Sequence, residues 1–299
     1  MAQFKTRARA LDLLGRQQIA GIPTAINELI KNAHDAYADR FDIDFLRKEN
    51  LLVLRDDGLG MTKEEFETRW LTIGTESKFA NKKTALPPVD KSKALRPIMG
   101  EKGIGRLAIA SIGKQVLIIS KAKLRNKNFK IVVAFINWEL FELPGINLED
   151  IAIPVKEFDC LPNEDDIDNI KNEVITSLDN LLKQDVILKE DYIRIKENVN
   201  NWNINPESLN RKLVGNFEFS GEKGGTFFYI SPVNETLIFD IEGDGDPKEA
   251  TKIEKMLMGF HNTMTPNHPK PVIDISFRDY RGEEGIYSVS YTHLTLPTT

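Results

Sequence analysis

The sequence contains a single cysteine, which excludes an intrachain disulfide. Its four histidines lack the H-x-x-x-H and H-x-E spacings that are typical of zinc sites. No apolar run approaches the roughly 18 residues of a membrane-spanning helix, and the start of the chain lacks the apolar centre of a signal peptide. We therefore expect a cytoplasmic protein with no membrane segment.

Neither sign of charge is in large excess, because 40 Lys and Arg residues face 45 Asp and Glu residues, for a formal net charge of −5. This balance argues against a nucleic-acid-binding surface spread over the whole chain, although it leaves a local basic patch open. The 299 residues, 41% of them hydrophobic, are enough for one or two domains with a sizeable core.

Residues 25–37, AINELIKNAHDAY, have the spacing of an amphipathic helix, and Thr24 stands where its N-cap is expected. At about 100° per residue, Glu28, Asn32 and Asp35 fall within about 60° of one another, opposite an apolar arc. Solvated helices often pair such acids with Lys or Arg, and this stripe has none at the i, i+4 and i+7 positions. It is either an ordinary solvated face or the lining of a site.

Two strands are predicted at residues 41–46 and 51–55, and the second runs into DDGLGM at residues 56–61. Glycines at a strand end let the backbone approach a flat ligand closely. Asp56 is suited to accept a hydrogen bond from the exocyclic amine of adenine, and it would reject the carbonyl of guanine. The alternative is an ordinary Asp-Gly turn.

A second glycine-rich stretch, GEKGIGR at residues 100–106, enters a helix of small and apolar residues that ends near Gly113. Backbone N–H groups at a helix start, together with the charge of Lys102, suit a phosphate. The stretch is neither a P-loop nor G-x-G-x-x-G. The preceding loop, up to Pro97, is rich in Lys and Pro, and we expect it to be mobile, either as a solvated loop or as a lid.

The third stretch, GEKGGT at residues 221–226, precedes a predicted strand at 227–231. There Thr226 can reach the edge of a ligand, and a plain hairpin turn is the alternative. Before it, residues 163–202 have a highly charged helical pattern that interrupts the strands. We interpret this segment as an insertion with either an interaction role or a structural one.

In this order, ELIKNAHDA, DDGLGM, GEKGIGR and GGT resemble the motifs of the GHKL ATPase superfamily. That superfamily includes gyrase B, the ninety-kilodalton heat-shock chaperones, histidine kinases, MutL and MORC proteins. The likeness spans residues 20–280 apart from the insertion. Locally it is strongest to the heat-shock and MORC types, through ELIKNAHDA and IGTESK, whereas the GFRGEAL of MutL is replaced by GIGRLA.

The resemblance implies an α+β fold: a two-layer α/β sandwich of the GHKL (Bergerat) type, with a mixed, mostly antiparallel sheet and helices on one face. We expect an ATP-binding domain over residues 1–270, with a helical insertion at about 160–212. Residues 271–299 are expected to begin a second, transducer-like domain or to be a truncated tail.

Carried over by position, the resemblance implies that Glu28 is the general base, Asn32 the Mg²⁺ ligand and Asp56 the adenine-binding aspartate. The other ATP-binding residues that it implies are Asp35, Gly58, Gly60, Met61, Lys78, Gly100, Lys102, Gly103, Gly105 and Thr226. Lys102, Gly103 and Gly105 correspond to the phosphate lid.

The implied function is Mg²⁺-dependent ATP binding and slow ATP hydrolysis that drive lid closure and homodimerisation, with a protein or DNA partner that stays unidentified. One alternative is an ATP-binding interaction module with negligible turnover. Another is a histidine kinase-like domain, but none of the histidines lies before the first motif, where a phosphoacceptor is expected. Glu28 favours the ATPase, because a domain that only binds ATP has no need of a base that activates water.

Overall fold

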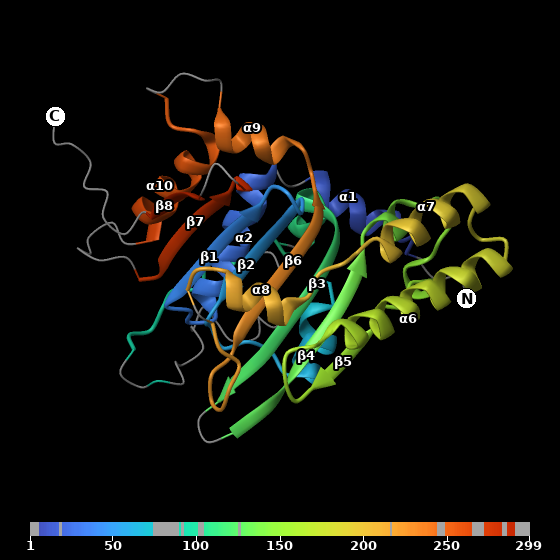
Figure 1. Cartoon of the computed structure of the whole chain (residues 1–299), viewed down its shortest axis with the longest axis horizontal. Helices are drawn as coiled ribbons and strands as arrows, with labels where there is room; N and C mark the ends of the chain where they lie inside the picture. Colours follow the sequence, from blue (N-terminus) through green and yellow to red (C-terminus); the bar gives the residue numbers. More distant parts are fainter. Residues whose placement is uncertain are drawn as a thin grey trace, which may run out of the picture.

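The computed structural model describes residues 6–17, 20–73, 90, 93–100, 105–124, 127–215, 217–243, 249–264, 272–282 and 286–290. Within them, one mixed sheet has the strand order β5-β4-β3-β6-β2-β1-β7-β8 (Figure 1). Neighbouring strands are antiparallel except for β1 and β7, which are parallel. The strands are β1 (Arg40–Leu46), β2 (Leu51–Asp56), β3 (Gly113–Leu124), β4 (Lys127–Asn137), β5 (Val155–Phe158), β6 (Gly225–Val233), β7 (Asp274–Tyr280) and β8 (Ile286–Ser290).

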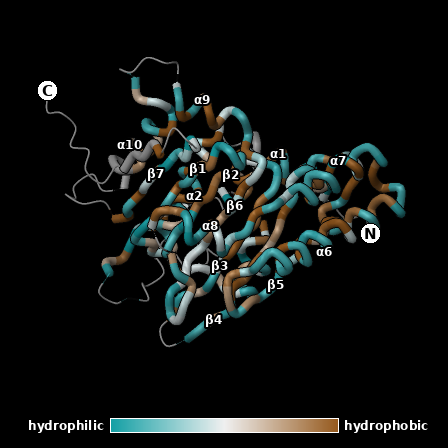
Figure 2. The backbone as a smooth tube through the Cα atoms, in the orientation of Figure 1, coloured by the Kyte–Doolittle hydropathy of each residue, from teal (hydrophilic) through white to brown (hydrophobic). Residues whose placement is uncertain are grey.

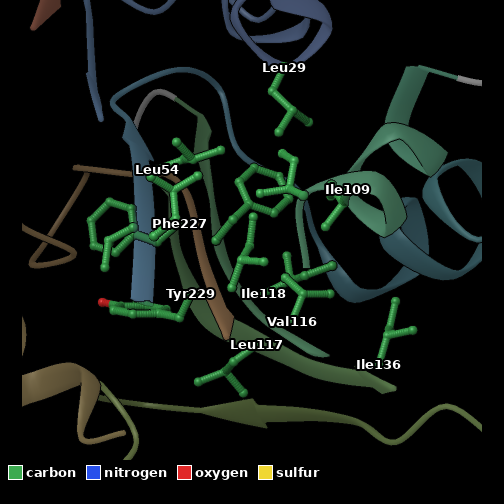
Figure 3. Packing of buried hydrophobic residues seen from close by; sticks show 14 of the residues in the cluster. Leu29, Leu54, Ile109, Val116, Leu117, Ile118, Ile136, Phe227 and Tyr229 are labelled. Carbon is green, nitrogen blue, oxygen red and sulfur yellow. The ribbon is translucent and has the colours of Figure 1, made fainter. Parts of the chain in front are cut away.

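One side of the sheet, which we call the near face, packs against helix α2 (Ile22–Asp35). Leu29 of α2 and Ile109 of α4 (Ile109–Ile112) lie on the same side as Leu54 of β2 and Ile118 of β3 (Figure 3). Helix α2 also contacts the 3₁₀ turn η3 (Gly105–Ala108), α9 (Thr236–Glu242) and α10 (Lys252–Met264), and α1 (Arg9–Gln17) contacts η3 and α4.

The other side of the sheet, the far face, carries the predicted helical insertion (Figure 1). Its helices are α6 (Glu164–Lys183), α7 (Lys189–Asn200) and α8 (Pro206–Lys212). The ring of Trp202 packs edge-on against Phe135 of β4, with 5.1 Å between centroids. Leu117 and Tyr229 project to this side, away from Leu29 (Figure 3). The insertion therefore covers strand surface that would otherwise be open to water.

The local signals in the sequence account for most of these elements. Apolar residues concentrate along the central strands, whereas the insertion is mixed in hydropathy (Figure 2). The apolar residues Ile26, Leu29 and Ile30 of α2 are buried. Asn163 caps α6 through a capping box with Asp166, and Thr62 does the same with Glu65. The latter box opens a short helix, α3 (Lys63–Glu65), that continues as a π-helix, η1 (Phe66–Trp70). The described residues also include three short elements between β4 and α6, which are α5 (Glu139–Glu142), a 3₁₀ turn at Leu148–Asp150 and the edge strand β5.

The structure confirms an α+β fold with a mixed, mostly antiparallel sheet, but helices cover both of its faces rather than one, because the insertion packs on the far face. The start of α2 also differs from the prediction. Thr24 is not an N-cap, because α2 already begins at Ile22 after Gly21. Pro23 in the first turn has no N–H to satisfy and a backbone angle suited to a helix, so the helix begins earlier than the sequence analysis expects. Strand β7, which follows the boundary expected at residue 270, pairs with β1 in parallel and so belongs to the same sheet, and the division of the chain at residue 270 stays a prediction. A second domain beyond it stays a prediction.

No helix among these described residues is long and apolar enough to cross a membrane.

Candidate nucleotide site

Three polar side chains form a row across neighbouring strands of the near face. Asp56, the last residue of β2, pairs with Thr226 of β6, and Thr226 pairs in turn with Ser120 of β3. Residues paired directly across a sheet project to the same side. All three are buried, with Ser120 fully enclosed. A polar row of this kind inside an apolar sheet is suited to reading the hydrogen-bonding edge of a ligand.

The carboxylate of Asp56 has unusual surroundings. It accepts a hydrogen bond from the backbone N–H of Gly58 at 2.8 Å, and no ion pair joins it to any residue in the described part of the chain. Burial raises the pKa of Asp56 to about 7, against the lowering effect of the Gly58 and Thr226 backbone groups. Its neighbour Asp57 has a structural task, because it accepts the backbone N–H groups of Asp39 and Arg40.

The DDGLGM loop, which follows β2, forms hydrogen bonds both to the end of α2 and to β3. The N–H of Leu59 donates to Ala36 O at 2.8 Å, and the N–H of Met61 donates to Ser120 Oγ at 3.0 Å. Gly60 has φ +59°, and a Cβ at this position would lie 1.9 Å from Lys121 O. Only glycine therefore permits this close approach of the loop to the sheet.

Glycine is also needed beside the aspartate itself. A Cβ at Gly58 would lie 2.9 Å from Asp56 Oδ1 and 3.0 Å from Ala36 O. The glycines of DDGLGM thus bring Asp56 and Met61 together with Thr226 at the carboxyl-terminal end of α2.

Farther toward the start of α2, Glu28 faces the beginning of η3. A Cβ at Gly105 would lie only 2.8 Å from Glu28 Oε2, so this glycine leaves room for the carboxylate. Glu28 Oε1 also accepts a hydrogen bond from Lys31 Nζ at 2.7 Å. Lys31 lies outside the polar stripe, and the sequence analysis did not predict this ion pair.

Asn32 lies exposed on α2, one turn after Glu28. Its carboxamide oxygen is a hard donor of the kind that Mg²⁺ accepts, and Mg²⁺ sites commonly use one or two protein ligands beside waters and phosphate oxygens. The residues present therefore fit a magnesium ion that is held mainly by the nucleotide and its waters.

Asp35 contributes differently from the expectation of a direct ATP contact. Its two carboxylate oxygens accept the backbone N–H groups of Met99 and Gly100, at 2.8 and 3.0 Å. The carboxylate therefore holds the start of the second glycine-rich stretch against α2. A contact between Asp35 and ATP stays a prediction.

Basic residues whose contacts the sequence analysis missed hold both ends of the stretch 93–106 against neighbouring parts of the chain. Arg96 donates to Ala38 O at 2.7 Å and to Val272 O at 3.1 Å, and Lys93 bonds Asp39 at 2.5 Å. At the other end, Arg106 donates to the carbonyl groups of Arg69 and Thr72. Only the excess of Lys and Arg around this loop hinted at such anchors.

Two further residues escaped sequence reasoning. Ser120 bonds Thr226 and Met61, but its place at the end of the apolar run VLII gave no signal. Lys121 donates from Nζ to Asn128 Oδ1, Phe219 O and Gly221 O, and thereby anchors the turn before Thr226. Burial lowers the pKa of Lys121.

Most of the predicted site residues therefore gather along α2. Asp56, Gly58, Gly60, Met61 and Thr226 cluster at its end, Glu28 meets Gly105, and Asp35 meets Gly100. Lys78, Lys102 and Gly103 lie outside the described residues. The assignment of these residues to ATP stays a prediction.

Comparison with known proteins agrees with this arrangement. Residues 21–159 match the family described as histidine kinase-, DNA gyrase B- and HSP90-like ATPase. The chain is 32% identical to ATPase morc-1 of Caenorhabditis elegans over 139 residues, which are 46% of this chain and 14% of that protein. It is 36% identical to the DNA mismatch repair protein MutL of Rickettsia rickettsii over 110 residues, which are 36% of this chain and 16% of MutL.

A third similarity is to a putative type II restriction enzyme, HgiDII, of Herpetosiphon aurantiacus. It is 35% identical over 85 residues, which are 28% of this chain and 12% of that protein. The chain thus spans less than a fifth of the length of each of these relatives in the alignments. These similarities are to an ATPase domain of the relatives. They cover only a small part of each relative, so the activities of the whole relatives are not assigned to this chain.

Proposed function

We propose that the chain is an ATPase domain of the GHKL superfamily that binds ATP with Mg²⁺ and hydrolyses it slowly. Its similarity to that family and to MORC and MutL proteins supports the proposal. The observation that carries the proposal is the closeness of Glu28 to Gly105, where the second glycine-rich stretch enters its helix. In the proposal, the backbone N–H groups of this glycine-rich stretch bind the terminal phosphate, and Glu28 lies beside the point where the stretch enters its helix.

In this proposal each of the residues gathered along α2 has a separate role in ATP binding or hydrolysis. Asp56 accepts the exocyclic amine of adenine, Asn32 supplies a ligand to Mg²⁺, and Glu28 takes a proton from the attacking water. The metal ion, when bound, neutralises charge on the phosphates. Lys31 holds the Glu28 side chain through their hydrogen bond and so restricts its rotamers.

Exchange of Glu28 for glutamine tests the general base. Glu28→Gln should retain ATP binding and lose about 10²- to 10⁴-fold in single-turnover hydrolysis, because only the proton acceptor is removed. Glu207→Gln is the matched control, since Glu207 also pairs with a basic residue on its own helix, at the far face. Hydrolysis by Glu28→Gln at the parental rate would exclude Glu28 as the base.

The pairing of Glu28 with Lys31 keeps a second function in view, that of an ATP-binding module with negligible turnover. An occupied carboxylate is a poorer proton acceptor than a free one. Lys31→Ala separates the two functions, since faster single-turnover hydrolysis is expected if the ion pair restrains Glu28.

Calorimetry with ATP and GTP on the same proteins tests the nucleotide site itself, and equal affinity for both nucleotides would exclude Asp56 from recognition of the base.

We also propose that lid closure over ATP promotes a homodimer through the amino-terminal arm. Residues 6–17 already pack on their own chain, because Ala8 and Leu11 are buried and Arg7 bonds Gly145 and Asn147. Leu13 and Leu14 are 41% and 40% exposed. The double variant Leu13→Asp, Leu14→Asp should abolish the dimer that a non-hydrolysable ATP analogue induces, while the monomer still binds ADP. Light scattering decides this, and an undiminished dimer would exclude the arm.

A further inference from the structure

Ser120 is a polar residue at the centre of the sheet, and the proposed function assigns it no role. Its side chain is fully buried on β3. Its hydroxyl lies 2.9 Å from Thr226 Oγ1, 3.0 Å from the N–H of Met61 and 3.2 Å from Gly225 O. One hydroxyl therefore connects the DDGLGM loop, the GGT strand and β3.

The hydrogen-bonding capacity of a hydroxyl makes this arrangement directional. A serine hydroxyl has one hydrogen to donate and two lone pairs. The N–H of Met61 occupies one lone pair. The single hydrogen then goes either to Gly225 O or to Thr226 Oγ1. In the first arrangement Thr226 must donate to Ser120 and presents only lone pairs to a ligand. In the second, the hydrogen of Thr226 is free for a ligand.

We infer that Ser120 is a positioning residue for base recognition, which acts by donating to Thr226 and so turns the Thr226 hydroxyl into a donor toward the nucleotide. The inference rests on the proposed function. Adenine presents an amine, which suits the acceptor Asp56, beside a ring nitrogen that accepts. Since Asp56 and Thr226 are paired across β2 and β6, a donor at Thr226 beside an acceptor at Asp56 matches that edge.

The alternative task for Ser120 is purely structural, as the anchor of Met61. A double-mutant cycle separates the two, with affinity measured by calorimetry for a non-hydrolysable ATP analogue with Mg²⁺. In the parent, Ser120→Ala should weaken binding about 3- to 10-fold, the usual worth of one hydrogen bond. In a Thr226→Val background, where no hydroxyl is left to orient, it should cost nothing further.

Thr226→Ser is the matched control, because it keeps the hydroxyl and removes only the methyl group. There Ser120→Ala should again weaken binding as it does in the parent. An equal loss in the Thr226→Val background would overturn the inference and leave Ser120 as an anchor of Met61. No loss in the parent would overturn it as well. Denaturant unfolding of each variant without nucleotide checks that the proteins compared are folded.

A base analogue gives a second measurement. The triphosphate of 1-deazaadenosine keeps the amine but has a C–H group in place of the accepting ring nitrogen. Ser120→Ala should leave its affinity unchanged, and a loss equal to that for the ATP analogue would overturn the inference. If the parent protein binds no adenine nucleotide at all, the proposed function fails instead, so the two failures are distinguishable.

Discussion

The two faces of the central sheet both bury aspartates, but they surround them in opposite ways. On the far face, Asp42 and Asp44 of β1 are completely enclosed and lie among guanidinium groups. Arg55 donates to Asp44 at 2.7 Å, and Arg278 of β7 donates to both aspartates. On the near face, Asp56 is nearly as deeply buried, and no described residue forms an ion pair with it.

The difference separates carboxylates that hold the fold together from Asp56, whose proposed role is to bind a ligand. A buried charge is tolerated when cations and hydrogen bonds surround it. The far-face network meets that condition and is closed by the insertion, because Arg55 also donates to Val214 O at 2.8 Å and contacts Asn210. Asp56 does not meet it, and its raised pKa is the consequence. An uncompensated carboxylate in a sheet is a mark of a functional site.

The charged residues of the far-face network come from neighbouring strands of the sheet. The paired residues of the network come from β1, β2 and β7, so β7 is joined to the hairpin of β1 and β2 by charge as well as by backbone hydrogen bonds. Arg55 directly precedes Asp56 in β2, with its side chain on the opposite face. One strand thus carries a structural charge and a proposed functional charge side by side.

Removing a cation from the far-face network should have the largest effect on stability. Arg55→Met keeps the bulk of the side chain but leaves part of the charge on Asp44 without its partner. We expect the free energy of unfolding to fall by about 3–5 kcal/mol, as measured by urea titration. Arg211→Met is the control, since its exposed pair with Glu207 should contribute less than about 1 kcal/mol. A similar small loss for both variants would contradict a structural role for the network.

Asp56→Asn should act in the opposite direction. The pKa of Asp56 is raised from 3.8 to about 7, so between these values the folded protein binds more protons than the unfolded chain. The free energy of unfolding of the nucleotide-free protein therefore falls as pH rises through that window, by up to about 4 kcal/mol. Above pH 7 Asp56→Asn should be the more stable protein, and its stability should lack this decline.

The same substitution should weaken ATP binding about 10- to 150-fold, because a hydrogen bond to a charged group contributes roughly 1.5–3 kcal/mol. Urea titrations at a series of pH values give the first effect and calorimetry the second. A variant that lost both stability and affinity would place Asp56 with the structural aspartates of the far face.

Sequence patterns predicted the parts of the fold and site that depend on neighbours along the chain. The hairpin of β1 and β2, the face of α2 and the glycines beside Asp56 follow from spacing alone. Contacts between distant segments carried no such signal. Arg278 meets Asp44 across 234 positions, and Ser120 meets Thr226 across 106. The parallel pairing of β7 with β1 likewise depends on a long crossover that local propensity does not encode.

The smallest expected effect comes from a far-face residue that departs from the rule of full pairing. The hydroxyl of Tyr229 and Nε of Arg55 are buried, and neither has a hydrogen-bond partner among the residues described. Burial and the nearby charge of Asp44 raise the pKa of Tyr229, against the effect of Arg55. A buried hydroxyl that forms no hydrogen bond contributes only its desolvation cost, so Tyr229→Phe should leave the free energy of unfolding unchanged or raise it by up to about 1 kcal/mol.

Urea titration measures the change. Tyr280→Phe is the control, because the Tyr280 hydroxyl bonds Asp44 at 3.2 Å and its removal should destabilise the protein. A loss of more than about 1 kcal/mol in Tyr229→Phe would indicate that its hydroxyl bonds an ordered water, and Tyr229 would then resemble the paired aspartates of the far face and differ from Asp56.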